Sequence, residues 1–167
     1  MKIGNGCLEL RIFAREGEFL MQELRKLVED TLNIYPLGNI FHLGDIRGIK
    51  IPSVQEVCRL FDMSILSKIK SSKKDSDILA LIKRKGVSRC YETGILESEA
   101  DPIIFGHELG HALGLSDSKC CQFYEDDYPK EELPHAGYTM CYDSKRFGGR
   151  KGFSPEDIEK LERWFLK

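Results

Sequence analysis

Apolar and polar residues follow two different periods along the first part of the chain, and the change of period separates a predicted strand from a predicted helix. Residues 8–13 alternate between apolar and polar side chains, which is typical of a half-buried strand. Residues 19–32 instead carry apolar side chains at helical spacing, at positions 20, 24, 27, 28 and 32. The pattern therefore predicts a strand followed by an amphipathic helix.

The rest of the first hundred residues favours further strands with one helix among them. Residues 35–51 contain strand-like stretches broken by glycine, and a Ser-x-x-Glu capping box then opens a predicted helix over 53–66. Residues 78–82 form a short apolar run typical of a buried strand, and 87–96 are predicted as one more strand. The predicted order is strand, helix, strand, helix, strand, strand.

Two later helices have clear start signals. Asp101 can cap the first free N–H groups of a helix, and Pro102 at its first position loses no hydrogen bond. Ser154 and Pro155 repeat this arrangement near the end of the chain, followed by apolar residues at positions 158, 161, 164 and 165. We therefore expect one helix after Asp101 and another at the end of the chain.

The helix after Asp101 carries the candidate chemistry, in the sequence His-Glu-Leu-Gly-His-Ala-Leu-Gly-Leu-Ser-Asp. Positions i and i+4 project from one helix face, so His107 and His111 can bind one metal ion with Glu108 beside them. Gly114 can adopt the left-handed conformation that reverses the chain, which would bring Asp117 to the same ion. Catalytic zinc usually has three protein ligands and an open position for water, so these residues form a complete candidate set.

This run resembles the His-Glu-x-x-His-x-x-Gly-x-x-His/Asp signature of the metzincin metallopeptidases, and Asp117 at its last position is similar to the snapalysin branch. Metzincins also have a methionine-containing turn beneath the metal, which the sequence Tyr-Thr-Met-Cys-Tyr at positions 138–142 resembles. By this resemblance Met140 packs under the metal site, and Tyr142 is a second catalytic residue that steadies the reaction intermediate. The last helix resembles the metzincin helix that packs behind the active-site helix.

The resemblance implies an α+β, zincin-like fold in which a twisted mixed sheet lies above the active-site helix. Residues 1–167 would form a single catalytic domain, a size that fits one hydrophobic core. Its N-terminal subdomain would comprise residues 1–115 with the active-site helix. A small C-terminal subdomain, residues 116–167, would contain the methionine turn and the final helix.

The implied function is that of a zinc metalloendopeptidase. A metal-activated water would attack a peptide carbonyl, while Glu108 accepts its proton and then delivers it to the leaving amine. The substrate, a peptide or a protein, would bind extended along an edge strand near residues 87–96. Because a purely structural metal site has no need of a general base, Glu108 favours an enzyme over a binding module.

Other ligand sets and another function class remain open. His135 is the main alternative to Asp117 as the third ligand. A gluzincin-like peptidase would instead use a later glutamate, at position Glu125, Glu131, Glu132 or Glu156. In a non-enzymatic, zinc-stabilised binding module, the metal would only fasten the fold.

The cysteines raise the question of a second zinc. Thiolate and imidazole groups suit a structural zinc, and four such residues follow the motif closely: Cys120, Cys121, His135 and Cys141. Archaemetzincins, another metzincin branch, carry a second zinc on cysteines near the active site. Their spacing, with a cysteine directly after the third ligand and a late Cys-x-x-Cys, is absent here. The alternative is reduced cysteines packed as small hydrophobes, and we expect Cys90 to be a strand cysteine of this kind.

Composition limits the partners. A formal net charge of −2 offers no electrostatic footprint for nucleic acid. No stretch approaches the roughly twenty apolar residues needed to cross a bilayer, and the first residues lack a signal-peptide core. The six cysteines form no secreted disulfide framework. We therefore expect a cytoplasmic protein, monomeric, without nucleic-acid or membrane partners.

Overall fold

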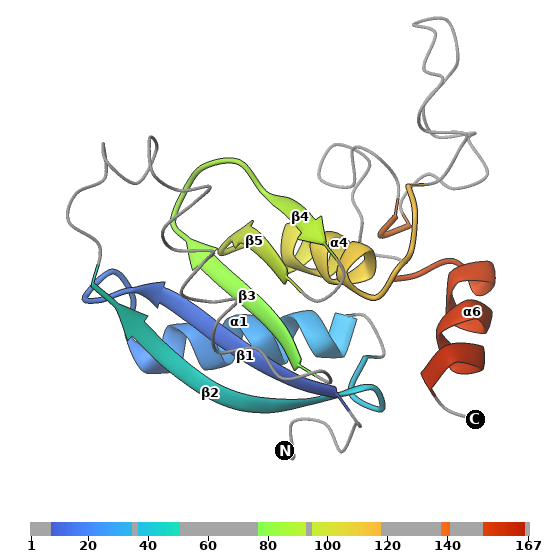
Figure 1. Ribbon diagram of the computed structural model, residues 1–167, viewed down its shortest axis with the longest axis horizontal. Helices are drawn as coiled ribbons and strands as arrows, with labels where there is room; N and C mark the ends of the chain where they lie inside the picture. The colour runs from blue at the N-terminus through green and yellow to red at the C-terminus, as the bar shows by residue number, and fades with distance from the viewer. Residues whose placement is uncertain are drawn as a thin grey trace, which may run out of the picture.

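The computed structural model describes residues 8–34, 37–50, 77–92, 95–117, 138–140 and 152–165. These residues form the following elements (Figure 1): β1 (Leu8–Arg15), α1 (Met21–Ile34), β2 (Phe41–Ile49), β3 (Asp77–Lys83), β4 (Arg89–Glu92), β5 (Ile95–Glu99), α4 (Pro102–Ala112) and α6 (Pro155–Phe165). The predicted helix over 53–66 lies outside the described residues.

The strands form one mixed sheet in the order β2-β1-β3-β5-β4. β2, β1, β3 and β5 run parallel to one another, and β4 is antiparallel to β5 at one edge. The central strand β3 is buried throughout positions 78–82, which explains why it reads as a continuous apolar run rather than an alternating one. A mixed sheet with separate helices confirms the α+β expectation.

The prediction of one strand over 87–96 is wrong, because this stretch divides into β4 and the start of β5. The two strands run antiparallel, with Arg89 paired to Glu97 and Cys90 to Leu96. The register becomes irregular between Cys90 and Glu92. Residues 87–96 have no regular alternation whose change could mark the reversal, and only Gly94, a poor strand former, interrupts them in the sequence.

Helices α1 and α4 share one core with the sheet. Leu10, Ile12 and Ala14, which lie on one face of β1, belong to the same buried cluster as the apolar stripe of α1. Phe105 and Leu109 of α4 join this cluster, and α4 also contacts α1, β5 and β4. The helix that carries the motif is therefore fixed against both the sheet and the first helix.

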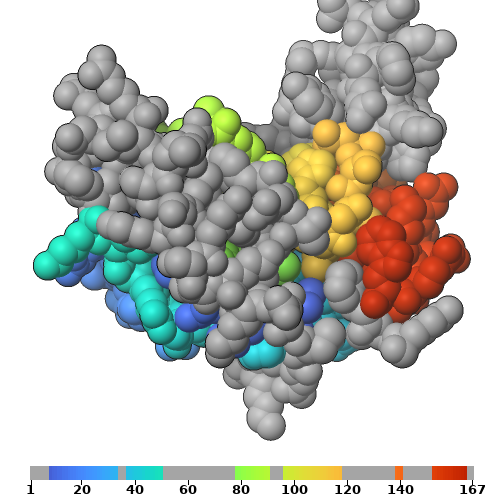
Figure 2. Space-filling view, in the orientation of Figure 1, coloured from blue at the N-terminus to red at the C-terminus, as the bar shows by residue number. Residues whose placement is uncertain are grey.

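Helix α6 lies beside α4, on the side away from β2 (Figure 1). Leu161 of α6 and the preceding Phe153 are buried in the common core. In Figure 2, the residues after α4 (orange) and those of α6 (red) adjoin on the surface. None of the helices in the described ranges is long and apolar enough to span a bilayer.

Candidate metal centre

Helix α4 begins as its start signals predict. The Asp101 side chain accepts hydrogen bonds from the backbone N–H groups of Ile103, at 2.9 Å, and Ile104, at 3.1 Å. Pro102 occupies the first turn, where its missing N–H leaves no gap in the hydrogen bonding. Because the first residue of the helix is fixed, the directions in which the side chains of His107 and His111 project are fixed too.

The two histidine rings face each other. Nε2 of His107 and Nε2 of His111 are 3.1 Å apart, and the ring centroids are 4.7 Å apart with perpendicular planes. This arrangement follows from the i, i+4 spacing on one helix face. Both rings therefore direct the same nitrogen to one point beside the helix.

Main-chain carbonyl groups hold both rings in this orientation. Nδ1–H of His107 donates to the Thr139 carbonyl at 2.7 Å, and Nδ1–H of His111 donates to the Leu115 carbonyl at 2.9 Å. Since a carbonyl oxygen can only accept, each Nδ1 carries the proton and each neutral ring keeps a lone pair on Nε2. Histidines that bind metals are commonly oriented by such a contact on the other nitrogen.

The chain reverses directly after α4 at Gly114, whose φ of 96° confirms the predicted left-handed conformation. The Leu115 N–H donates to the Gly110 carbonyl at 2.9 Å, which closes the helix end. The reversal carries Asp117 back, so that its Oδ1 lies 3.4 Å from Nε2 of His107 and 3.3 Å from Nε2 of His111.

The three converging atoms have the chemistry and the spacing of a metal site. While both rings are neutral, two imidazole lone pairs and a carboxylate oxygen meet at one point, and among the described residues the buried Asp117 Oδ1 then has no hydrogen-bond donor. Ligands about 2.0–2.1 Å from a tetrahedral zinc lie about 3.3 Å from one another, close to the separations of 3.1, 3.3 and 3.4 Å seen here. His107, His111 and Asp117 therefore fit a zinc ion.

The charges of these groups depend on one another. A hydrogen bond from the protonated ring to Asp117 raises the pKa of His111, against the effect of its burial. Burial lowers the pKa of His107. For Asp117, burial opposes ionisation, but the hydrogen bond with His111 and the nearby imidazoles outweigh it and lower its pKa. The carboxylate is thus ionised at neutral pH.

Glu108 lies beside the cluster in a poorly solvated position. Its residue is 6% exposed, and its Oε2 has no hydrogen-bond partner among the described residues. The backbone N–H of Cys90, on strand β4, donates to the carboxyl group. Burial is the main cause that raises the pKa of Glu108 to about 7.

Met140 packs directly beneath α4. Its side chain is fully buried, and a Cβ atom placed on Gly110 would overlap the Met140 sulfur and lie 3.0 Å from Phe153. Glycine at this position of the motif thus allows the methionine to approach the helix backbone. The neighbouring Thr139 provides the carbonyl that orients His107, so the same short segment both supports and aligns the helix.

Several predicted site residues lie outside the described part of the chain. These are Tyr142, Cys120, Cys121, His135, Cys141, Glu125, Glu131 and Glu132. Glu156, the remaining alternative ligand, is exposed in the first turn of α6 and does not belong to the His107, His111 and Asp117 cluster. Cys90, on strand β4, is partly buried and packs against the core.

Nothing in the sequence marks Thr139 or Leu115 as the residues whose carbonyl groups orient the rings. No sequence signal could have identified them, since every residue has a main-chain carbonyl. Glu97, a buried carboxylate close enough to Glu108 to raise its pKa, was also missed. A glutamate within a strand looks like any solvent-facing residue when only the alternating pattern is available.

Comparison with known proteins establishes the fold. No protein-family model and no curated protein matches the sequence. The structure resembles that of an archaemetzincin from Methanopyrus kandleri, with a TM-score of 0.58 and 17% identity over 93% of this chain and 94% of that one. The chain has a zincin-like fold.

A second structure with the zincin-like fold is metalloproteinase-II from Bacteroides fragilis. Its TM-score is 0.52 and its identity 11%, over 96% of this chain and 53% of that one. The present chain thus spans about half the length of that metalloproteinase. At such identities the likeness concerns the fold, and the chemistry must be argued from the site itself.

Proposed function

We propose that the protein is a zinc metallopeptidase that hydrolyses peptide bonds. The strongest support is the convergence of three unprotonated ligand atoms, from His107, His111 and Asp117, beside the buried carboxyl group of Glu108. The zincin-like fold, which the archaemetzincin and the metalloproteinase share, supports the same reading. A metal that only fastened the fold would not account for a poorly solvated carboxyl group at this position.

His107, His111 and Asp117 would hold the ion, and the metal when bound would supply a Lewis acid and an activated water molecule. Glu108 then accepts the proton of the attacking water and later delivers it to the leaving amine nitrogen. Burial raises the pKa of Glu108 to about 7 before an ion binds, and the charge of a bound cation would lower it again, so that the carboxylate is ionised and can accept a proton at neutral pH. Tyr142 would steady the reaction intermediate.

A peptide substrate would bind in extended form along β4. This strand lies at the edge of the sheet, and its Cys90 N–H reaches Glu108, so the edge adjoins the reacting groups. Pairing through the main chain would present a scissile bond without requiring particular side chains. We further propose one catalytic domain, divided at the chain reversal into subdomains 1–115 and 116–167, with Asp117 as a snapalysin-like third ligand.

The proposal is tested by metal analysis of the purified protein together with a peptide-cleavage assay. We expect about one zinc per chain at the site, and cleavage of a fluorogenic peptide library that stops with a chelator and returns when zinc is added. Absence of zinc binding would refute the proposal. Stoichiometric zinc without hydrolysis of any peptide would favour the binding module instead.

A further inference from the structure

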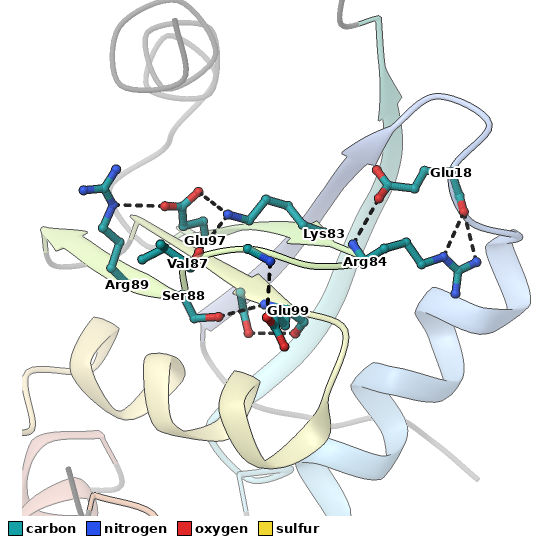
Figure 3. A network of polar contacts seen from close by, with 10 residues as sticks. Glu18, Lys83, Arg84, Val87, Ser88, Arg89, Glu97 and Glu99 are labelled. Carbon is teal, nitrogen blue, oxygen red and sulfur yellow. Dashed lines mark hydrogen bonds and ion pairs between the residues drawn. The ribbon is translucent and has the colours of Figure 1, made fainter. Parts of the chain in front are cut away.

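A buried carboxylate that the proposed reaction does not use lies on the strand next to the edge. Glu97 of β5 is 1% exposed, and it forms ion pairs with Lys83 of β3 and Arg89 of β4, each at 3.0 Å. Figure 3 shows Glu97 between these two cations, with its carboxylate directed to both. The three side chains connect three adjacent strands, β3, β5 and β4.

These contacts hold the beginning of β4, a short strand that pairs with β5 over only a few residues. Arg89 and Glu97 are direct cross-strand partners, and the register becomes irregular after the next residue, Cys90. Lys83 also donates to the Val87 carbonyl at 2.7 Å, just before the strand begins. Since few ladder hydrogen bonds can hold so short an edge strand, the ion pairs contribute much of what fixes its position.

The beginning of β4, which these ion pairs hold, is also the part of the strand that contacts Glu108, the proposed general base. Cys90 follows Arg89 directly, and its backbone N–H donates to the Glu108 carboxyl. The other carboxyl oxygen of Glu108 accepts no hydrogen bond from the described residues. A shift of Arg89 would therefore move the amide group that orients Glu108.

We propose that Arg89 and Glu97 are positioning residues for Glu108, acting through the backbone of Cys90. The inference rests on the proposed function, in which Glu108 transfers protons. Burying the Glu97 carboxylate is a costly way to join strands, even though its partner Arg89 is 46% exposed, because apolar side chains of similar size often stabilise a fold as well or better. Charge-assisted contacts have strict geometry, however, and so fix where the next backbone amide points.

The chain offers variants that separate this role from general stability. Arg89→Gln and Glu97→Gln remove the ion pair, while Arg89→Lys keeps a positive charge near Glu97. Arg84→Gln is the matched control, in the connection between β3 and β4: Arg84 contacts Glu23 at 3.0 Å and the main chain of Glu18, away from Glu97 (Figure 3). All variants are studied as full-length, zinc-loaded protein.

Two measurements are made on each variant. The first is kcat at saturating peptide, so that weaker substrate binding along β4 does not contribute. A misplacement of about 1 Å can cost about a hundredfold in rate, so we expect Arg89→Gln and Glu97→Gln to lower kcat by roughly ten- to a hundredfold with zinc content unchanged. Arg89→Lys should recover most of the loss, and Arg84→Gln should leave kcat within about twofold.

The second measurement is the amide signal of Cys90 in the ¹⁵N NMR spectrum, which does not depend on turnover. In the native protein we expect a downfield amide proton that Glu108→Gln shifts upfield, and Arg89→Gln should cause the same shift while Arg84→Gln does not. An unchanged Cys90 signal in Arg89→Gln, or a kcat equal to that of Arg84→Gln, would overturn the inference. If the native protein cleaves no peptide, the proposed function fails, and the Cys90 signal alone still decides whether Arg89 positions Glu108.

Discussion

Glu108 lies next to the His107, His111 and Asp117 cluster, and it is almost fully buried. Burial raises its pKa to about 7, so the carboxyl group exchanges protons readily at neutral pH. The imidazole groups beside it are held as acceptors by main-chain carbonyl groups. Each side chain in the cluster thus has a protonation state set by a specific neighbour.

Replacing Glu108 by Gln should abolish hydrolysis while leaving zinc bound, because the amide keeps the shape of the side chain but cannot accept the proton. General-base catalysis typically contributes 10²–10⁴-fold, so we expect kcat to fall by at least about a hundredfold. Peptide cleavage and zinc content are measured on the same sample. Glu156→Gln, on the exposed first turn of α6, is the control and should retain full activity.

Zinc binding should weaken as the pH falls. Binding requires neutral His111, whose pKa is raised above 6.5 by the hydrogen bond to Asp117, and ionised Asp117, whose pKa is lowered. Protons therefore compete with zinc first at His111, and the affinity should fall about tenfold per pH unit below the pKa of that residue. Competition titrations with a zinc chelator between pH 5 and pH 8 measure this, and a constant affinity over that range would contradict it.

Helix α4 positions its two histidines through contacts at both ends and along one face. The Asp101 cap fixes the start, Gly114 ends the helix, and Met140 packs against Gly110 in between. Because the same segment that contains Met140 supplies the carbonyl for His107, packing and ring orientation are coupled at this face. Crowding at Gly110 should therefore disturb metal binding as well as stability.

Gly110→Ala should destabilise the protein and weaken zinc binding, because the new Cβ would overlap the Met140 sulfur. Overpacking of a core typically costs about 1–3 kcal/mol of unfolding free energy. Chemical denaturation and zinc titration measure the two effects. Gly38→Ala is the matched control, since a Cβ there has no atom within 4 Å, and equal effects of the two substitutions would contradict the packing argument.

Sequence patterns predicted those elements whose signals are local. β1, α1, α4 and α6 were confirmed to within a few residues, because period, caps and prolines act over one or two turns. The division of 87–96 into two strands was not predicted, since the antiparallel pairing of β4 with β5 is a tertiary contact that the order of apolar and polar residues does not reveal. For the site, spacing on a helix brought His107 and His111 together, whereas the contact with Thr139 depends on tertiary packing.

Among the described residues, the candidate metal centre draws on three parts of the chain. α4 provides both imidazoles, the reversal after it provides Asp117, and residues 138–140 provide the carbonyl and the sulfur beneath the helix. An ion bound there would hold these parts together in the folded state and lose its ligand geometry when the chain unfolds. Metal binding should therefore stabilise the whole zincin-like fold rather than one element.

Removing zinc should lower the melting temperature. Binding stabilises a fold by about 4 kcal/mol when free zinc exceeds Kd a thousandfold, and for a chain of this size that is roughly 8–16 °C. Differential scanning calorimetry with zinc and with chelator gives the difference. Asp117→Asn should shrink it, and Asp45→Asn, on the opposite edge of the sheet, should not.

The dependence of His107 on the Thr139 carbonyl has a consequence for biosynthesis. Both imidazoles and the aspartate leave the ribosome before the residue that aligns the first ring, so a growing chain holds an unaligned donor set. Tight capture of an ion would therefore wait until Thr139 has emerged and can align the His107 ring. The order of residues along the polypeptide would thus delay formation of the aligned ligand set until the segment that contains Thr139 has been synthesised.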